Sequence, residues 1–193
     1  KMFLKAIDIK PDYFDAYNNL GAVYNLTQDY EKAYETIKKA LEFNSKNADT
    51  YNNLGTSARN LNREEEAIEH YYKAISIDPK LINAYSNLCS LFERSNNLDQ
   101  LQIIIKKTKE LKLDQFDEIK FRKAQLFSRK KDFDRSISTL KEIDDDKISE
   151  KIKTEKYELL GMDLDKVQNF KEAFECFQKS NEIVKESMKF KQL

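Results

Sequence analysis

One hexapeptide recurs at a fixed distance along the chain and constrains the fold more than any other feature. Ala16–Gly21 reads AYNNLG, Thr50–Gly55 reads TYNNLG 34 residues later, and Ala84–Cys89 reads AYSNLC after the same interval. A weaker copy, KYELLG, covers Lys156–Gly161. Self-similarity with a period of roughly 20–50 residues is typical of repeat architectures, in which each repeat is one small supersecondary element. The sequence therefore predicts a stack of similar elements.

The composition indicates that these elements are helical and gives little sign of a polyanionic or membrane partner. Charged residues make up 35% of the chain, which has only 3 Gly and 2 Pro, and such a mixture favours helix. The 34 basic and 34 acidic residues cancel, so no net field points to nucleic acid or membrane. No apolar run approaches the ~18 residues of a membrane span, and no signal peptide is visible. Because Cys89 and Cys176 sit inside helical patterns, we expect reduced core residues and a cytoplasmic location.

Apolar periodicity predicts two helices in each repeat. Tyr17, Leu20 and Tyr24 share one stripe of a helix over about 13–26, and a second helix is predicted over about 30–43. Proline residues and polar breaks separate successive pairs. The predicted organisation is a single array made of a half repeat, five repeats (the fourth degenerate) and a tail: 1–11, 12–47, 48–81, 82–116, 117–153, 154–187 and 188–193.

Several short signals predict where second helices begin. Asp29 is a candidate N-cap, and Asn62 with Glu65 has the spacing of a capping box. Asn169 with Glu172 supplies a similar start. We therefore expect side-chain caps at the starts of these three helices.

Two kinds of residue recur at fixed phase because of packing. Small residues form one column, at the point where the two helices of a repeat should approach backbone to backbone. A large side chain at that point should overpack. A column of tyrosines should fill the wedge between repeats. The small column is Gly21, Gly55, Cys89, Ala124 and Gly161; the tyrosine column is Tyr17, Tyr51, Tyr85 and Tyr157.

The middle of the chain departs from this pattern. Lys120 and Lys123 fall where Tyr and Leu stand in other repeats, and 144–147 is predicted to be a solvated acidic connector. A run of basic residues is interpreted either as a solvated face or as a site for an acidic partner. This run is Lys106, Lys107, Lys109, Lys112, Lys120, Arg122, Lys123, Arg129, Lys130 and Lys131.

The combined columns of aromatic, Leu, small residue, aromatic and then Ala and Pro resemble the tetratricopeptide repeat over nearly the whole chain. The resemblance implies an all-α fold, a right-handed superhelix of about eleven antiparallel helices. It also implies that first helices line a concave face, and that the chain is a non-catalytic scaffold that binds a peptide or protein segment. Neither a cofactor nor a metal is expected, and the single His70 is interpreted as a surface or packing residue.

Helical phase predicts which side chains line the concave face. These are Asp15, Asn18, Asn19, Asp49, Asn52, Asn53, Thr56, Asn83, Ser86, Asn87 and Ser90. The series Asn19, Asn53 and Asn87 resembles the asparagine ladder in the superhelical arm of protein O-linked N-acetylglucosamine transferases, where amides hold the backbone of an extended peptide. An amide offers both a donor and an acceptor, as a peptide backbone requires. The alternative is that these asparagines are solvated filler kept by duplication of the repeats.

Two further hypotheses concern the ends of the chain. Residues 170–187 resemble the last repeat before the catalytic domain of bacterial tetratricopeptide-repeat sulfotransferases. This suggests the arm of a larger enzyme, such as a sulfotransferase or glycosyltransferase, that presents substrate or mediates assembly. The half repeat at 1–11 suggests a longer parent and exposed ends through which the chain self-associates.

Overall fold

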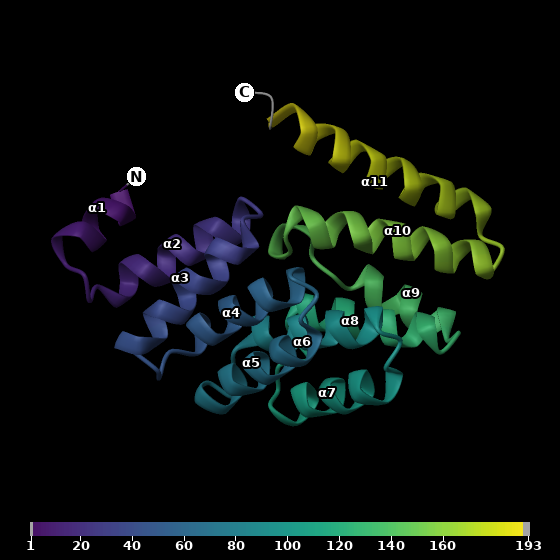
Figure 1. The fold of residues 1–193 in the computed structure, drawn as a ribbon. Coiled ribbons are helices and arrows are strands. Elements are labelled where there is room, and N and C mark those ends of the chain that lie inside the picture. Colours follow the sequence, from purple (N-terminus) through teal and green to yellow (C-terminus); the bar gives the residue numbers. More distant parts are fainter. Residues whose placement is uncertain (1, 191–193) are drawn as a thin grey trace. The chain divides into compact units, whose positions relative to one another are not determined.

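The computed structural model describes the backbone of residues 2–190 and the side chains of residues 2–187. The described residues form eleven α-helices and one 3₁₀ helix, η1 (Figure 1). The prediction of an all-α fold with about eleven helices is therefore confirmed. The elements are α1 (Met2–Ile9), α2 (Phe14–Leu26), α3 (Tyr30–Phe43), α4 (Ala48–Asn60), α5 (Glu64–Ile77), α6 (Ile82–Arg94), α7 (Leu98–Glu110), α8 (Asp117–Arg129), α9 (Phe133–Lys141), η1 (Asp145–Lys147), α10 (Glu150–Lys166) and α11 (Phe170–Phe190).

The chain divides into two compact units, an N-terminal unit over Lys1–Leu91 and a C-terminal unit over Phe92–Leu193. In the N-terminal unit α2 packs on α3 and α4 on α5, and α2 also contacts α4. In the C-terminal unit α8 packs on α9 and α10 on α11, and α8 also contacts α10. First helices thus contact first helices within each unit. Of the predicted tail over 188–193, α11 includes 188–190, and 191–193 lie outside the described residues.

A left-handed residue marks the turn between the two helices of every repeat. The amide of the residue after it donates to a carbonyl near the end of the first helix, as in the 2.9 Å bond from Asp29 N to Tyr24 O. A residue in this conformation followed by such a bond is a Schellman turn, which satisfies carbonyls that the helix end leaves free. The left-handed residues are Gln28, Asn62, Asn96, Lys131 and Gln168.

These turns correct the predicted capping signals. Asn62 has φ of 59° and lies in the turn, so the predicted capping box is wrong, and Arg63 is the N-cap of α5 without a side-chain cap. Asp29 is the N-cap of α3 as predicted, but its carboxylate binds Lys32 at 2.6 Å and caps no backbone amide. The Asn169 side chain donates to Glu172 at 2.9 Å. The turn geometry, rather than side-chain capping, is what recurs at these helix starts.

The column of small residues makes room for a side chain of the second helix. A Cβ added at Gly21 would lie 2.2 Å from Cγ1 of Ile37, whereas the nearest backbone atom, Ala33 O, is 3.4 Å away. At Gly55 it would lie 2.8 Å from the ring of Tyr71. The prediction of a close helix approach is therefore correct in place, but the neighbour that needs the space is mainly a side chain rather than the backbone.

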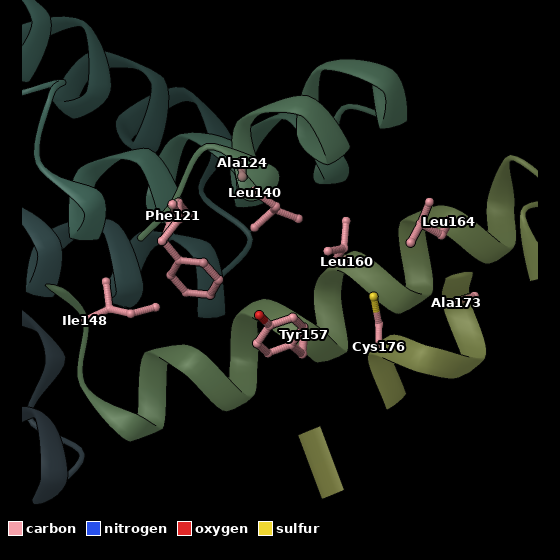
Figure 2. Close-up of a cluster of buried hydrophobic side chains, with 10 residues drawn as sticks. Phe121, Ala124, Leu140, Ile148, Tyr157, Leu160, Leu164, Ala173 and Cys176 are labelled. Carbon is pink, nitrogen blue, oxygen red and sulfur yellow. The ribbon is translucent and has the colours of Figure 1, made fainter. Parts of the chain in front are cut away.

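The C-terminal unit has a continuous apolar core that α8, α9, α10 and α11 build together (Figure 2). In that view Leu160 of α10 lies between Leu140 of α9 and Cys176 of α11. The cluster consists of Phe121, Ala124, Leu140, Ile143, Ile148, Tyr157, Leu160, Leu164, Ala173 and Cys176. Cys176 in this core and Cys89 in the N-terminal unit are buried and not disulfide-bonded.

Candidate partner-binding face

All the predicted partner-binding residues lie on the first helices α2, α4 and α6, within the N-terminal unit. Burial divides them into three groups. The exposed residues are Asp15, Asn19, Asp49 and Asn83; the half-buried residues are Asn18, Asn53, Thr56, Asn87 and Ser90; the buried residues are Asn52 and Ser86. The face is therefore a mixture of groups that are open to a partner and groups that the fold already uses.

Asn52 and Asn87 are engaged with each other. The Asn87 side-chain nitrogen donates to Oδ1 of Asn52 at 3.0 Å, and only 7% of Asn52 is exposed. The backbone carbonyl of Asn52 accepts from Thr56 Oγ1 at 3.0 Å. Asn52 thus ties α4 to α6 in place of facing a ligand. Sequence reasoning placed both residues on one flank but missed the bond between them, because helical phase does not reveal a contact across repeats.

One repeat earlier, the equivalent pair of side-chain amides does not form this hydrogen bond within the described residues. Asn18 and Asn53 are the equivalents of Asn52 and Asn87, yet Oδ1 of Asn18 is buried without a hydrogen-bond partner. In the described part of the chain, the side-chain amides of Asn19 and Asn53 also make no hydrogen bond. We call the stretch of this face between α2 and α4 the open step. Its side-chain amides, those of Asn19 and Asn53, hydrogen-bond neither to the rest of the described chain nor to each other.

A second polar link, which the sequence analysis did not single out, joins α2 to α4. Asn25 donates from its side chain to the backbone carbonyl of Asn53 at 3.0 Å and accepts from Ser57 Oγ at 2.9 Å. Asn25 follows Gly21 by four residues, and Ser57 follows Gly55 by two. This link holds the backbone of Asn53 in place, while the side-chain amide of Asn53 stays without a hydrogen bond in the described chain.

The C-terminal unit repeats this link with a charged group. Ser128 follows Ala124 by four residues, Asp163 follows Gly161 by two, and Ser128 Oγ donates to Asp163 Oδ1 at 2.6 Å. Asp163 is buried, and among the described residues no group donates a hydrogen bond to its Oδ2. Burial raises the pKa of Asp163, against the opposing hydrogen bond from Ser128.

The asparagine series does not continue into the C-terminal unit. Counted from Ala124, the positions of Asn52 and Asn53 hold Phe121, which is fully buried, and Arg122, whose guanidinium donates to Gln125 at 2.9 Å. A ring and a cation cannot offer a peptide backbone both a donor and an acceptor. The amide face is therefore a property of the first three repeats.

Asp145 is the centre of a charged network, so the prediction of a solvated connector over 144–147 is wrong at this residue. Its carboxylate accepts from Lys156 at 2.7 Å and from the Tyr157 hydroxyl at 2.5 Å, and Lys179 lies 3.4 Å away. Burial acts to raise the pKa of Asp145, but these hydrogen bonds and charges outweigh it and lower the pKa from 3.8 to about 2. The buried Lys156 ammonium also donates to Ile143 O at 2.9 Å.

His70 is a packing residue, in agreement with the prediction. Its ring lies between those of Tyr34 and Tyr51, with centroids 6.3 Å from each. Burial lowers its pKa, against the opposing charges of Glu66 and Glu69. The tyrosine column therefore receives part of its packing from the following second helix.

The last helix carries apolar side chains in contact with solvent. Phe170 and Phe174 are each 62% exposed, whereas Tyr34, the equivalent of Phe174 in the N-terminal unit, is buried and donates to Glu66 at 2.7 Å. Self-association through the chain ends stays a prediction, which sedimentation at several protein concentrations would check. Within the described residues, none of the helices combines the length and the apolar character that crossing a bilayer needs.

Comparison with known proteins finds one repeat family that matches part of the chain and several solved structures with the same fold. Residues 12–80 match the family model of the tetratricopeptide repeat, which typically serves as a non-catalytic scaffold for protein–protein interactions. A search of curated proteins finds no match at the level of sequence. The suggested likeness to sulfotransferases receives no support from these comparisons.

Several solved structures share the fold. The APC/C hetero-tetramer Cut9–Hcn1 superposes with a TM-score of 0.82 at 14% identity, over 94% of this chain but only 35% of that chain. PilW, a type IV pilus biogenesis factor, gives 0.73 at 18% identity over 90% of this chain and 79% of that one. PilF of Pseudomonas aeruginosa gives 0.71 at 16% identity over 88% and 75%. At these identities the likeness shows the fold alone, and it agrees with the predicted fold class.

Proposed function

We propose that the face of α2, α4 and α6 binds an extended segment of a partner protein through the main chain of that segment. The observation that carries the proposal is the open amide step between α2 and α4. Within the described residues, the exposed Asn19 amide and the half-buried Asn53 amide make no hydrogen bond. The main chain of a bound segment can supply these partners, and each hydrogen bond is worth about 1 kcal/mol.

The chemistry of the face fits an extended peptide. Each residue of such a peptide presents one N–H and one C=O, and each asparagine side chain supplies the complementary pair. Asp15 and Asp49 are exposed in the first turns of α2 and α4, beside the amides. Their carboxylates favour a segment that carries Lys or Arg, because charge complementarity selects among otherwise similar main chains.

Helix spacing sets how the peptide would align with the amides. Packed helices lie about 8–10 Å apart, and an extended chain advances about 3.3 Å per residue. Successive asparagines should therefore meet roughly every third residue of the peptide. The middle contact, at Asn53, has a fixed backbone because Asn25 binds its carbonyl.

A display experiment tests the proposal directly. Random peptides displayed on phage are selected on the intact chain, and the enriched peptides are then synthesised and titrated by fluorescence anisotropy. Replacing Asn19 and Asn53 together, as Asn19→Ala and Asn53→Ala, should weaken binding about tenfold or more, because each lost hydrogen bond is worth about 1 kcal/mol. Methylation of the peptide nitrogens that face these side chains should weaken binding of the unaltered protein to a similar extent.

The matched control replaces two exposed amides of α11, Gln178→Ala and Asn181→Ala. These changes should leave the affinity unchanged. Full affinity of the Asn19/Asn53 variant, with its helicity intact, would contradict the proposal. The proposal would also be contradicted if changes to the peptide side chains abolished binding and methylation of the peptide backbone did not.

A further inference from the structure

The connection between α7 and α8 is built differently from the other connections that lead from a second helix to the next first helix. Lys112 takes the left-handed conformation with φ of 58°, and the amide of Leu113 donates to Thr108 O at 2.8 Å. In the described chain no other such connection contains a left-handed residue, and α3 and α5 end at the extended residues Asn44 and Asp78.

A small cavity of about 240 Å³ lies at this connection, within the C-terminal unit. Its accessible wall is almost wholly apolar, with Ile105 of α7 and Ile119 of α8 among the lining residues. The Thr108 hydroxyl donates to Ile105 O at 2.8 Å, so it has no need of a polar ligand. The cavity is larger than the ~150 Å³ that holds benzene and smaller than the roughly 300–1,000 Å³ of small-molecule sites. One large apolar side chain matches this size.

Lysines without acidic partners surround the apolar wall. Lys106, Lys109 and Lys123 line the cavity together with one carboxylate, Asp114, and in the described part of the chain none of the three lysines forms an ion pair. Two neighbouring lysines are paired: Lys107 lies 3.5 Å from Glu110, and Lys120 lies 2.8 Å from Asp117. The cavity rim therefore carries three cations against one carboxylate, which gives it a net positive charge.

We propose that this cavity docks an acidic segment of a partner protein, with one large apolar side chain in the cavity and flanking carboxylates on Lys106, Lys109 and Lys123. The lysines favour a partner that carries negative charge. The apolar wall favours an acidic protein segment over a nucleic acid. A nucleic acid would neutralise the lysines but carries no flexible apolar side chain for the cavity. This site shares no residue with the asparagine face, so an experiment can contradict either proposal without the other.

Titration of a designed probe tests the inference. The probe is a fluorescently labelled synthetic peptide in which a single leucine is flanked on both sides by aspartates and glutamates. Binding to the intact chain is followed by anisotropy at low and at moderate salt, and it should weaken as salt screens the charges. Replacing the leucine by serine, or the acids by their amides, should each reduce the affinity about tenfold.

Charge reversal on the protein supplies the second arm. The double variant Lys106→Glu and Lys109→Glu alters two exposed side chains and should bind the probe at least tenfold more weakly. The control reverses two exposed lysines of second helices in the N-terminal unit, Lys38→Glu and Lys73→Glu, with the same change in net charge. Its affinity should stay within about twofold of that of the unaltered chain.

Three results would overturn the inference. Equal losses in the two double variants would mean that only net charge matters. Equal affinity for the leucine and serine probes would leave the cavity without an occupant. Tighter binding of a single-stranded oligonucleotide than of the leucine probe, lost in the Lys106/Lys109 variant, would assign the lysines to nucleic acid.

Discussion

The two units bury different kinds of polar group. In the N-terminal unit the buried polar side chains are neutral: Thr50, Asn52, Ser57 and Ser86. In the C-terminal unit they include two acids and two bases: Asp117, Arg122, Lys156 and Asp163. Asn52 and Ser57 find partners in an adjacent repeat, Asn87 and Asn25, and Thr50 finds its partner in the nearby Asn47. Charged groups need stronger compensation, and part of it comes from outside the repeat pattern.

Lys156 is a buried charged group whose compensation comes from outside the repeat pattern. Its equivalents in the other repeats are Ala16, Thr50, Ala84 and Ile119, all buried and uncharged. The ammonium is compensated by Asp145, which lies in η1 rather than in a repeat helix. A repeat can thus keep its packing around a buried charge when a neighbouring connector supplies the compensating group.

The largest expected effect tests this compensation. Asp145→Ala leaves the Lys156 ammonium, whose side chain is 5% exposed, with the Ile143 carbonyl as its remaining hydrogen-bond acceptor. Breaking a buried pair from one side costs about 3 kcal/mol or more. Lys156→Met removes the buried charge itself and should cost less than about 1 kcal/mol. Urea unfolding measures both.

The double variant Asp145→Ala/Lys156→Met distinguishes compensation from simple packing. Its stability should match that of Lys156→Met alone, because no buried charge remains to be compensated. Additive losses in the double variant would show that the two side chains stabilise the unit independently.

The glycine column offers a second contrast between the units, of about 1–2 kcal/mol. A Cβ at Gly55 would meet the ring of Tyr71, which is fully buried, whereas a Cβ at Gly161 would meet Phe177, which is 37% exposed and can move toward solvent. Gly55→Ala should therefore cost about 2 kcal/mol by overpacking. Gly161→Ala should cost less than 1 kcal/mol, since helix propensity favours Ala by up to about 1 kcal/mol. Equal losses in urea unfolding would contradict this difference.

Acid titration should separate Asp145 from Asp163, two carboxylates of the C-terminal unit whose pKa values are shifted in opposite directions. The pKa of Asp145 is lowered to about 2, so its contribution is full above the unfolded pKa of about 3.9 and is lost as the pH falls toward 2. After allowance for solvent screening of this partly exposed group, the loss should be about 1–2 kcal/mol. The pKa of Asp163 is raised, so its effect has the opposite sign, and stability falls as the pH rises above the unfolded value.

Asp163→Asn keeps an acceptor for Ser128 and removes the charge. The variant should gain stability relative to the unaltered chain at pH 7 and show no gain at pH 3, as measured by urea unfolding at each pH. Asp134→Asn, at an exposed position of α9, is the control and should change neither value. A gain at pH 3 as large as that at pH 7 would show that burial of the charge is not the cause.

The sequence predicts the repeat and the helix bounds well, because both depend on local periodicity. The second helix predicted over about 30–43 is α3, Tyr30–Phe43. It does not predict partners that are distant in sequence. Asp145 looks like a solvated residue in an acidic run, and only the fold brings Lys156 and Lys179 to it.

The same limit applies to the candidate face. Phase places Asn52 and Asn53 on one flank of the helix, but a difference of about 100° between adjacent residues decides which of them meets the next repeat. Asn52 is the one that meets it, and Asn53 remains open. Helical phase therefore places these polar residues on one flank, but it does not show which of them already bind a neighbouring repeat.

The smallest expected effect tests the difference between the two steps of that face. Asn87→Ala removes the donor to Asn52 and leaves a buried oxygen without a partner, which should cost about 1 kcal/mol in urea unfolding. Asn53→Ala is the matched change one repeat earlier. It should cost less than about 0.5 kcal/mol, because the Asn53 side chain makes no hydrogen bond in the described chain. Equal costs would mean that Asn53 closes onto Asn18 in solution as Asn87 does onto Asn52, and the open step would then not exist to receive a peptide.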